Sequence, residues 1–154
     1  MAPPETTPRS TALPDALRDA RSIAERIGAD EAAADTERAR LVVGELPDLN
    51  DGSEEALLLG TGEVLHATRR AAMLENGAMP IGGSLYLTSE RLVHIGQERH
   101  EVPLEKIAES AVALERLLLL DMTDGSDLAI EVDQPRLLSV QLAAARANAR
   151  RQAT

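Results

Sequence analysis

Apolar residues recur every three or four positions near both ends of the chain and every second position in between. Near the N-terminus this spacing predicts an amphipathic helix over 14–27 that ends at Gly28, then a second helix over 31–45 capped by Asp30. The first helix has one apolar stripe, formed by Leu13, Leu17, Ala20, Ile23, Ala24 and Ile27. A short isolated helix is only marginally stable in water, so we expect this stripe to be buried on the rest of the chain or on a partner.

From residue 60 onward the spacing is typical of strands. It predicts seven strands, at about 63–73, 83–89, 91–97, 100–104, 107–114, 116–123 and 127–133. A hairpin turn is expected at 124–126, where Asp and Ser flank Gly125. The last strand alternates apolar and polar residues from Leu128 to Asp133, which indicates one face in the core and one face in water.

A helix is expected to close the chain. Pro135 suits its first turn, and the helix should run through Gln152. Its buried stripe is Leu138, Leu142, Ala145 and Ala149. The sequence therefore predicts a sheet of short strands followed by one amphipathic helix.

Residues 82–107 carry a specific resemblance. The strand Leu85-Tyr86-Leu87-Thr88, the turn that leads to Arg91-Leu92-Val93, and the segment from Val102 to Ile107 resemble the GRAM and bacterial pleckstrin-homology-like families. The resemblance covers about residues 60–152. It implies an α+β fold, a seven-stranded antiparallel bent barrel capped by the C-terminal helix, to which the N-terminal helices are extra. It also implies a structural role for Arg91, paired with Glu90 or Glu98 across the hairpin, and a packing role for Tyr86.

Composition divides the chain into three parts. Residues 1–12 are rich in Pro, Thr and Ser, so we expect a disordered tail. Residues 13–59 form a helical extension and a linker, with a turn-rich stretch at 47–53 and one helical turn at 54–59. The resemblance described above implies that residues 60–154 form the GRAM or pleckstrin-homology-like domain.

The net charge of −10 is uneven, because residues 1–59 hold 6 arginines and 13 acidic residues. A negative field repels phosphate backbones and anionic lipids, so we expect no nucleic-acid partner, and membrane contact is disfavoured. No secretory signal pattern is visible at the N-terminus, and the longest apolar runs, 56–59 and 117–120, are far too short to span a bilayer. A cytoplasmic location is the expectation.

The histidines and the acidic residues are the first candidates for a metal site or a catalytic base. His94 and His100 are close enough in sequence to meet across a turn, but neither they nor His66 complete a recognised ligand spacing. The chain has no cysteine, which excludes thiolate metal sites and cysteine nucleophiles. The Asp48–Gly52 stretch is one residue short of a calcium loop and is expected to be a turn.

Glycines, serines and basic residues give no site either. Gly60-x-Gly62 lacks a third glycine for a phosphate cradle, and Gly82-Gly83 is expected to be a turn that needs positive φ. Ser84, Ser89 and Ser110 lack the G-x-S-x-G context of a nucleophile elbow. Arg69 and Arg70 are placed as in lipid-binding relatives, but the following loop, 75–81, has no cation, and we expect both arginines to face solvent.

These observations assign no catalytic, metal or cofactor-binding residue, so no cofactor and no enzymatic activity are expected. The leading hypothesis is a non-catalytic protein-interaction or scaffold module of a bacterial cell, with a protein partner or self-association. A peripheral membrane module is the alternative.

Overall fold

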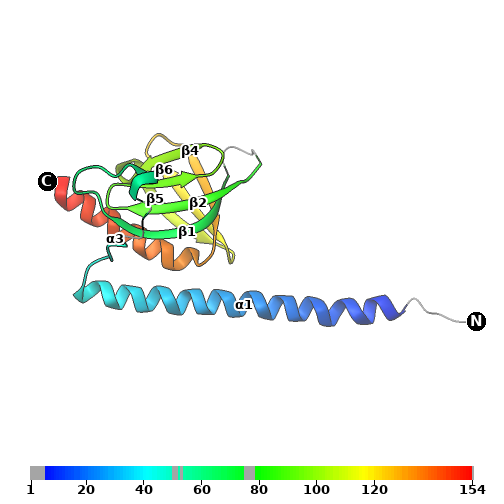
Figure 1. Cartoon of the computed structure of the whole chain (residues 1–154). Coiled ribbons are helices and arrows are strands. Elements are labelled where there is room, and N and C mark those ends of the chain that lie inside the picture. The colour runs from blue at the N-terminus through cyan, green and yellow to red at the C-terminus, as the bar shows by residue number, and fades with distance from the viewer. Residues whose placement is uncertain (1–5, 50–51, 53, 75–78, 154) are drawn as a thin grey trace, which may run out of the picture.

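The computed structural model describes residues 6–49, 52, 54–74 and 79–153. The elements follow the order that the sequence predicts after residue 60 (Figure 1). Three helices and seven strands are described, with one 3-10 turn: α1 (Thr6–Val43), α2 (Glu54–Leu57), β1 (Leu65–Leu74), β2 (Ile81–Thr88), β3 (Arg91–Ile95), β4 (Arg99–Pro103), η1 (Leu104–Lys106), β5 (Ile107–Ala113), β6 (Leu117–Met122), β7 (Asp127–Val132) and α3 (Pro135–Ala153).

The seven strands form one antiparallel sheet in the order β4-β3-β2-β1-β7-β6-β5. The bent seven-stranded antiparallel barrel capped by a C-terminal helix was predicted, and the seven antiparallel strands followed by that helix are confirmed. The sheet does not close, because the edge strands β4 and β5 have no ladder between them. The chain passes from one edge to the other through η1.

Two glycines allow the sheet to pack closely on itself. Gly83 lies inside β2, and a Cβ there would collide with the carbonyl oxygen of Ile95 in β3. A Cβ on Gly96 would likewise meet the carbonyl of Gly82. The expectation of a positive-φ turn at Gly82-Gly83 is therefore wrong: both residues lie in β2 without positive φ, and it is at Gly83 that the missing side chain allows the close backbone approach.

The main core lies between the inner face of the sheet and α3. The predicted stripe of α3 is buried as expected, with Leu138 at 1% exposure and Leu142 at 0%, and Ala149 packs at its edge. Ile130 and Val132 of β7 point into the same core, which confirms the alternation predicted for the last strand. The described core is almost entirely aliphatic.

A second, smaller core lies on the outer face of β1, β2 and β3. Leu57 of α2 packs there with Leu65 and Val93, and Tyr86 borders the cluster. The segment that precedes β1 therefore runs across the outside of the sheet and covers part of it. Tyr86 has the packing role that the resemblance implied.

The N-terminal region is one helix of 38 residues and not two. Gly28 lies in its middle and does not end a helix, and Asp30 does not cap the helix that was predicted over 31–45. Helical backbone already begins at Thr6, inside the stretch predicted to be a tail; residues 1–5 lie outside the described part of the chain. The expected break is absent because an exposed glycine weakens a helix without stopping it, and because Asp30 has a different partner, described below.

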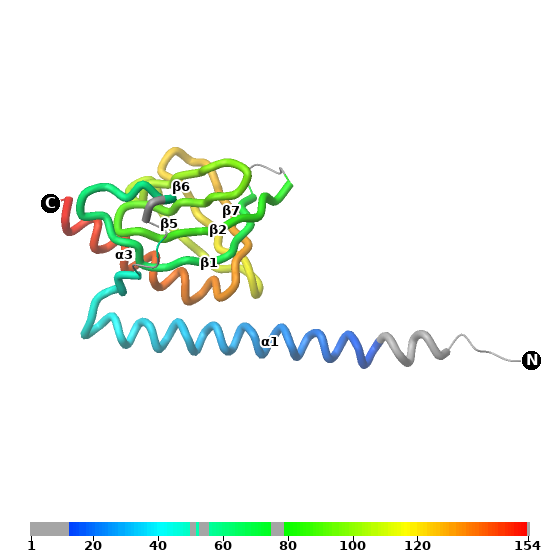
Figure 2. The backbone as a smooth tube through the Cα atoms, in the orientation of Figure 1, coloured from blue at the N-terminus to red at the C-terminus, as the bar shows by residue number. Residues whose placement is uncertain are grey.

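α1 and α3 run side by side in the same direction (Figures 1 and 2). Only the C-terminal half of α1 lies along α3. The N-terminal half projects past the edge of the sheet, and we call its residues 13–25 the arm. Leu13 and Leu17 on the arm are 63% and 56% exposed, so the stripe predicted to be buried is left in solvent at this end.

Candidate interaction site

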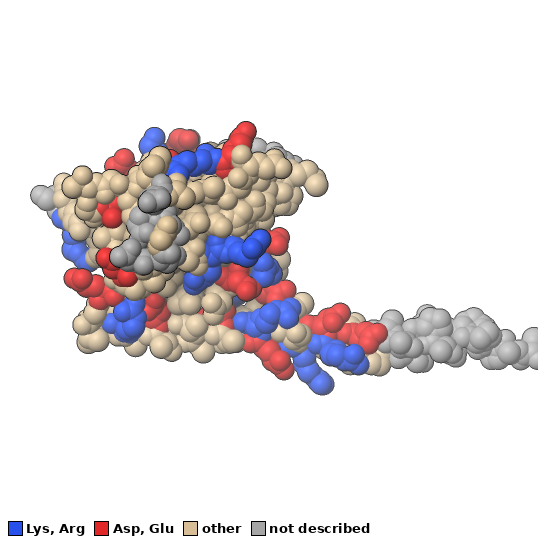
Figure 3. All heavy atoms as spheres, viewed as in Figure 1, with Lys and Arg blue, Asp and Glu red and all other residues tan. Residues whose placement is uncertain are grey.

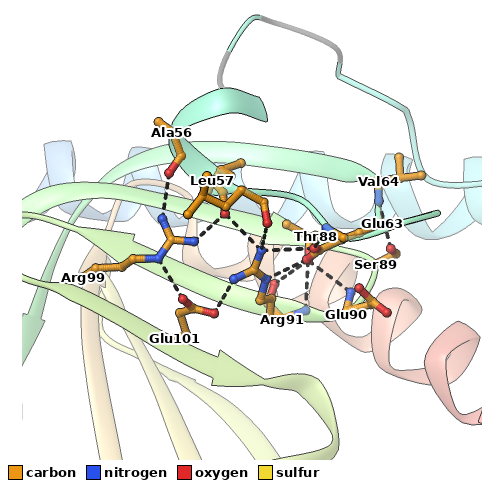
Figure 4. A network of polar contacts seen from close by, with 12 residues as sticks. Ala56, Leu57, Glu63, Val64, Thr88, Ser89, Glu90, Arg91, Arg99 and Glu101 are labelled. Atoms are coloured by element: carbon orange, nitrogen blue, oxygen red, sulfur yellow. Dashed lines mark hydrogen bonds and ion pairs between the residues drawn. The ribbon is translucent and has the colours of Figure 1, made fainter.

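The polar network around Arg91 fastens α2 to the sheet (Figure 4). The Arg91 guanidinium donates to both oxygens of Glu63, at 2.8 and 3.1 Å, and also to Glu101. Thr88 donates from its hydroxyl to Glu63 at 2.6 Å. The Arg91 side chain is 15% exposed and that of Glu63 only 2%. Arg91 is therefore paired as expected, but with Glu63 and Glu101 instead of Glu90 or Glu98.

Arg91 and Arg99 also bind the C-terminal end of α2. Arg99 donates to the carbonyls of Ala56, at 2.7 Å, and Leu57, and Arg91 donates to those of Leu57 and Leu58, at 3.1 and 3.2 Å. Leu58 has φ of 55°, the left-handed conformation that often ends a helix. The last carbonyls of a helix carry partial negative charge, so two cations there stabilise this short helix.

The charges in this network hold each other ionised. Burial alone would raise the pKa of Glu63, but hydrogen bonds from Arg91, Thr88 and the Gly60 amide outweigh it and lower this pKa below its ordinary value. The same ion pair raises the pKa of Arg91. The charged groups of this network are paired with one another, which is typical of a cluster that stabilises a fold and not of a reactive site.

The histidines meet as predicted but form no metal site. His94 lies directly opposite His100 in the β3–β4 ladder. His94 is fully buried, 3.0 Å from the carbonyl of Ala71, and His66 lies 2.7 Å from the carbonyl of Pro47. No group of three or more His, Cys, Asp or Glu side chains suited to a metal occurs among the described residues.

The remaining candidate loops add no site. Gly62 and Gly52 both have positive φ, as in ordinary turns. Asn50 and Asp51 of the calcium-like stretch lie outside the described residues. Gly60 donates its amide to Glu63 at 2.8 Å, and Ser89 accepts from the amide of Val64, so both hold the chain before β1 in place.

Asp30 of α1 caps α3. Its carboxylate is 3% exposed and accepts hydrogen bonds from the backbone amides of Arg136 and Leu137, at 2.8 and 3.0 Å. The Arg136 guanidinium lies 3.5 Å from the same carboxylate. A carboxylate at a helix N-terminus satisfies free amides and the positive end of the dipole. The sequence predicted that Asp30 caps the helix directly after it. In the structure Asp30 caps α3, which begins about a hundred residues later in the chain.

A chain of polar contacts extends this docking. Glu37 of α1 accepts from the amide of Gln141 at 2.9 Å, and Gln141 accepts from Arg69 of β1 at 3.5 Å. Burial lowers the pKa of Arg69, and the nearby carboxylates of Asp30, Asp133 and Glu37 oppose this shift. Arg69 is thus half-buried on the inner side of β1, and the expectation that it faces solvent is wrong. Arg70 is exposed as expected.

The end of the sheet that carries the β1–β2, β3–β4 and β6–β7 connections is acidic. The two connections that the structure describes in full, 96–98 and 123–126, contain Glu98 and Asp124 and no Lys or Arg. The β1–β2 loop lies partly outside the described residues. Figure 3 shows acidic and basic side chains interspersed over the molecule, with no broad basic area on the face in view. Such a surface offers little attraction for anionic lipids.

The arm is one place where the described part of the chain leaves large apolar side chains in solvent. The described helices include none that is both long and apolar enough to span a bilayer. A cavity of about 690 Å³ lies between the β2–β3 turn, η1 and the end of α3, and it mixes Glu90 and Glu105 with Arg146 and Arg150. It has no distinct charge. The arm, by contrast, exposes large apolar side chains on a defined helix face.

Comparisons with known proteins give matches among solved structures alone. No protein-family model matches the chain, and no curated protein matches it in sequence. Among solved structures it is similar to the C-terminal domain of an unknown protein from Leishmania infantum (16% identity, 60% of this chain and 93% of that chain, TM-score 0.47). It is also similar to the N-terminal PH domain of human ARAP2 (11%, 56% and 80%, 0.44) and to ISP3, an inner membrane complex protein of Toxoplasma gondii (10%, 72% and 94%, 0.45). Similarities this low say nothing about a ligand or a partner.

Proposed function

We propose that the chain is a non-catalytic protein-interaction or scaffold module of a bacterial cell, built as a GRAM or pleckstrin-homology-like domain over 60–154 with a helical extension before it. The observation that carries this proposal is the arm. Its C-terminal continuation is anchored by buried polar contacts to α3, while Leu13 and Leu17 remain exposed. A helix held rigidly at one end, with an apolar face in water at the other, is suited to bind another protein.

Capture from a lysate of the producing cells tests this function. The full chain should recover at least one protein, and the double variant Leu13→Glu with Leu17→Glu should no longer recover it. The two changes remove apolar side chains from the arm and leave the half of α1 that is anchored to α3 unaltered. Arg70→Glu, an exposed change on β1, is the matched control and should recover the same protein. Recovery of nothing above background by the unmodified chain, the cell's own copy of the same chain included, would contradict the proposal.

Membrane binding is expected to be absent. With vesicles of phosphatidylglycerol or cardiolipin at physiological salt, the protein should stay in the supernatant, because the net charge of −10, with Glu98 and Asp124 in two connections at one end of the sheet, opposes an anionic surface. Sedimentation at two salt concentrations is the measurement. Pelleting that high salt abolishes would show electrostatic lipid binding and would favour the peripheral membrane function instead.

A further inference from the structure

One face of α1 carries a regular series of residues that the monomer leaves exposed. Its positions alternate spacings of four and three, as in helices that pack on another helix, and all eight are exposed: Leu17, Arg21, Ala24, Gly28, Glu31, Asp35, Arg38 and Val42. We call this series the seam. Docking on α3 uses a neighbouring face, with Asp30, Ala34 and Glu37, so the seam stays free after α1 has docked.

The seam borders a groove between α1 and α3. The first part of the groove, about 370 Å³, is polar and includes Glu31, Asp35 and Arg136. The second part, about 480 Å³, is largely apolar, lined mainly by Leu41, Val42, Val140, Ala143 and Ala144. Arg38 and Ser139 line both parts, so the two form one continuous channel along the helix pair. Its length and apolar end suit a helix.

Gly28 has no packing reason in the monomer. A Cβ placed there would have no atom within 4 Å, and the residue lies in the middle of a helix, where glycine is destabilising relative to alanine. Glycine allows two helix backbones to approach closely. Its place on the seam, one turn from Ala24, marks a point where a second helix can cross.

We propose that a second copy of this chain covers the seam, in a twofold dimer whose α1 helices pair antiparallel and cross at Ala24 and Gly28. The charges select this occupant and direction. With that crossing, Arg21 of each copy lies level with Glu31 of the other, so the pair of opposite charges forms twice. In a parallel pair, each charged residue would instead lie beside the same residue of the other copy, so like charges would face each other.

Reciprocal packing brings the arm of each copy along the α1–α3 groove of the other. Leu13 then lies level with Ala39, next to the apolar part of the groove, and Leu17 lies level with Asp35 and next to Arg38. Every contact occurs twice, because a twofold interface is self-complementary. This inference rests on the proposed interaction function and names its partner.

Equilibrium sedimentation of the purified chain over a concentration series tests the dimer. The unmodified chain should dimerise, and Leu17→Glu should raise the dissociation constant at least about a hundredfold, because the lost contact counts twice. Gly28→Leu should also prevent dimerisation while leaving thermal unfolding of the monomer unchanged or improved, since leucine favours helix. Ala29→Leu, which adds the same side chain one position away and off the seam, is the matched control and should leave dimerisation unchanged.

A charge exchange tests the antiparallel register. Arg21→Glu and Glu31→Arg alone should each weaken the dimer about tenfold or more, and the two changes together should restore it. A chain that stays monomeric at all concentrations, a dimer that survives Leu17→Glu, or a double variant that is not restored would each overturn the inference. If the purified chain is monomeric but the arm still captures another protein, this inference fails and the proposed function stands.

Discussion

Arg91→Met is expected to destabilise the fold by roughly 3–5 kcal/mol at neutral pH, because it leaves the nearly buried Glu63 carboxylate without its cation. Methionine keeps much of the side-chain volume, so loss of the ion pair dominates over loss of packing. α2 also loses its contacts from Arg91 to the carbonyls of Leu57 and Leu58. Urea unfolding at several pH values is the measurement.

The pH dependence separates this cause from a packing defect. In the unmodified chain the pKa of Glu63 is below its ordinary value of 4.5, so its stabilising contribution is complete above that pH and is lost as pH falls through the lowered pKa. In Arg91→Met, burial is opposed only by the remaining hydrogen bonds, so this pKa is higher. The difference in stability between the two proteins should therefore shrink below about pH 4.5.

Glu63→Gln is the companion variant. Combined with Arg91→Met it removes the uncompensated charge, so the double variant should be more stable than Arg91→Met alone. If the loss of unfolding free energy in Arg91→Met is the same at all pH values, and if Glu63→Gln does not reduce that loss, then Arg91 acts by packing alone.

Leu138→Asp is expected to prevent folding. Leu138 is 1% exposed in the main core, and an unpaired carboxylate there costs several kcal/mol against a total stability of roughly 5–15 kcal/mol. Circular dichroism should show no cooperative melting. Ala143→Asp, on an exposed position of the same helix, introduces the same group and should melt nearly as the unmodified chain at low concentration. A cooperative transition of normal midpoint in Leu138→Asp would contradict the core assignment.

The sheet and α3 could be predicted from the sequence because their signals are local. Alternation sets each strand, and turns such as the one at Gly125, which has positive φ, mark where strands end. The final helix was predicted within a residue of its bounds, since Pro135 and the stripe through Leu138 and Leu142 lie close together in sequence. Closure of the barrel was the exception, because pairing of β4 with β5 depends on the path through η1.

The N-terminal helix was misread because its signals have distant causes. Gly28 resembles a helix end, and Asp30 resembles the cap of a following helix. In the structure the Asp30 carboxylate is taken up by the amides of Arg136 and Leu137, which no local pattern shows. The residues around Arg91 follow the same rule. Glu90 and Glu98 are nearest to Arg91 in sequence. The pairing of β3 with β4 instead brings Glu101 to Arg91, and the segment before β1 brings Glu63 to it.

The cap from Asp30 to α3 has a consequence for synthesis of the chain. Residues 6–43 leave the ribosome before the sheet does, but the amides that bind Asp30 belong to α3 and become available only after all the strands between them have been made. Contacts this distant in sequence form late, since the intervening chain must first be ordered. During synthesis the nascent N-terminal helix is therefore exposed on every side and can meet a chaperone, or the same helix on a neighbouring ribosome, before its own domain exists.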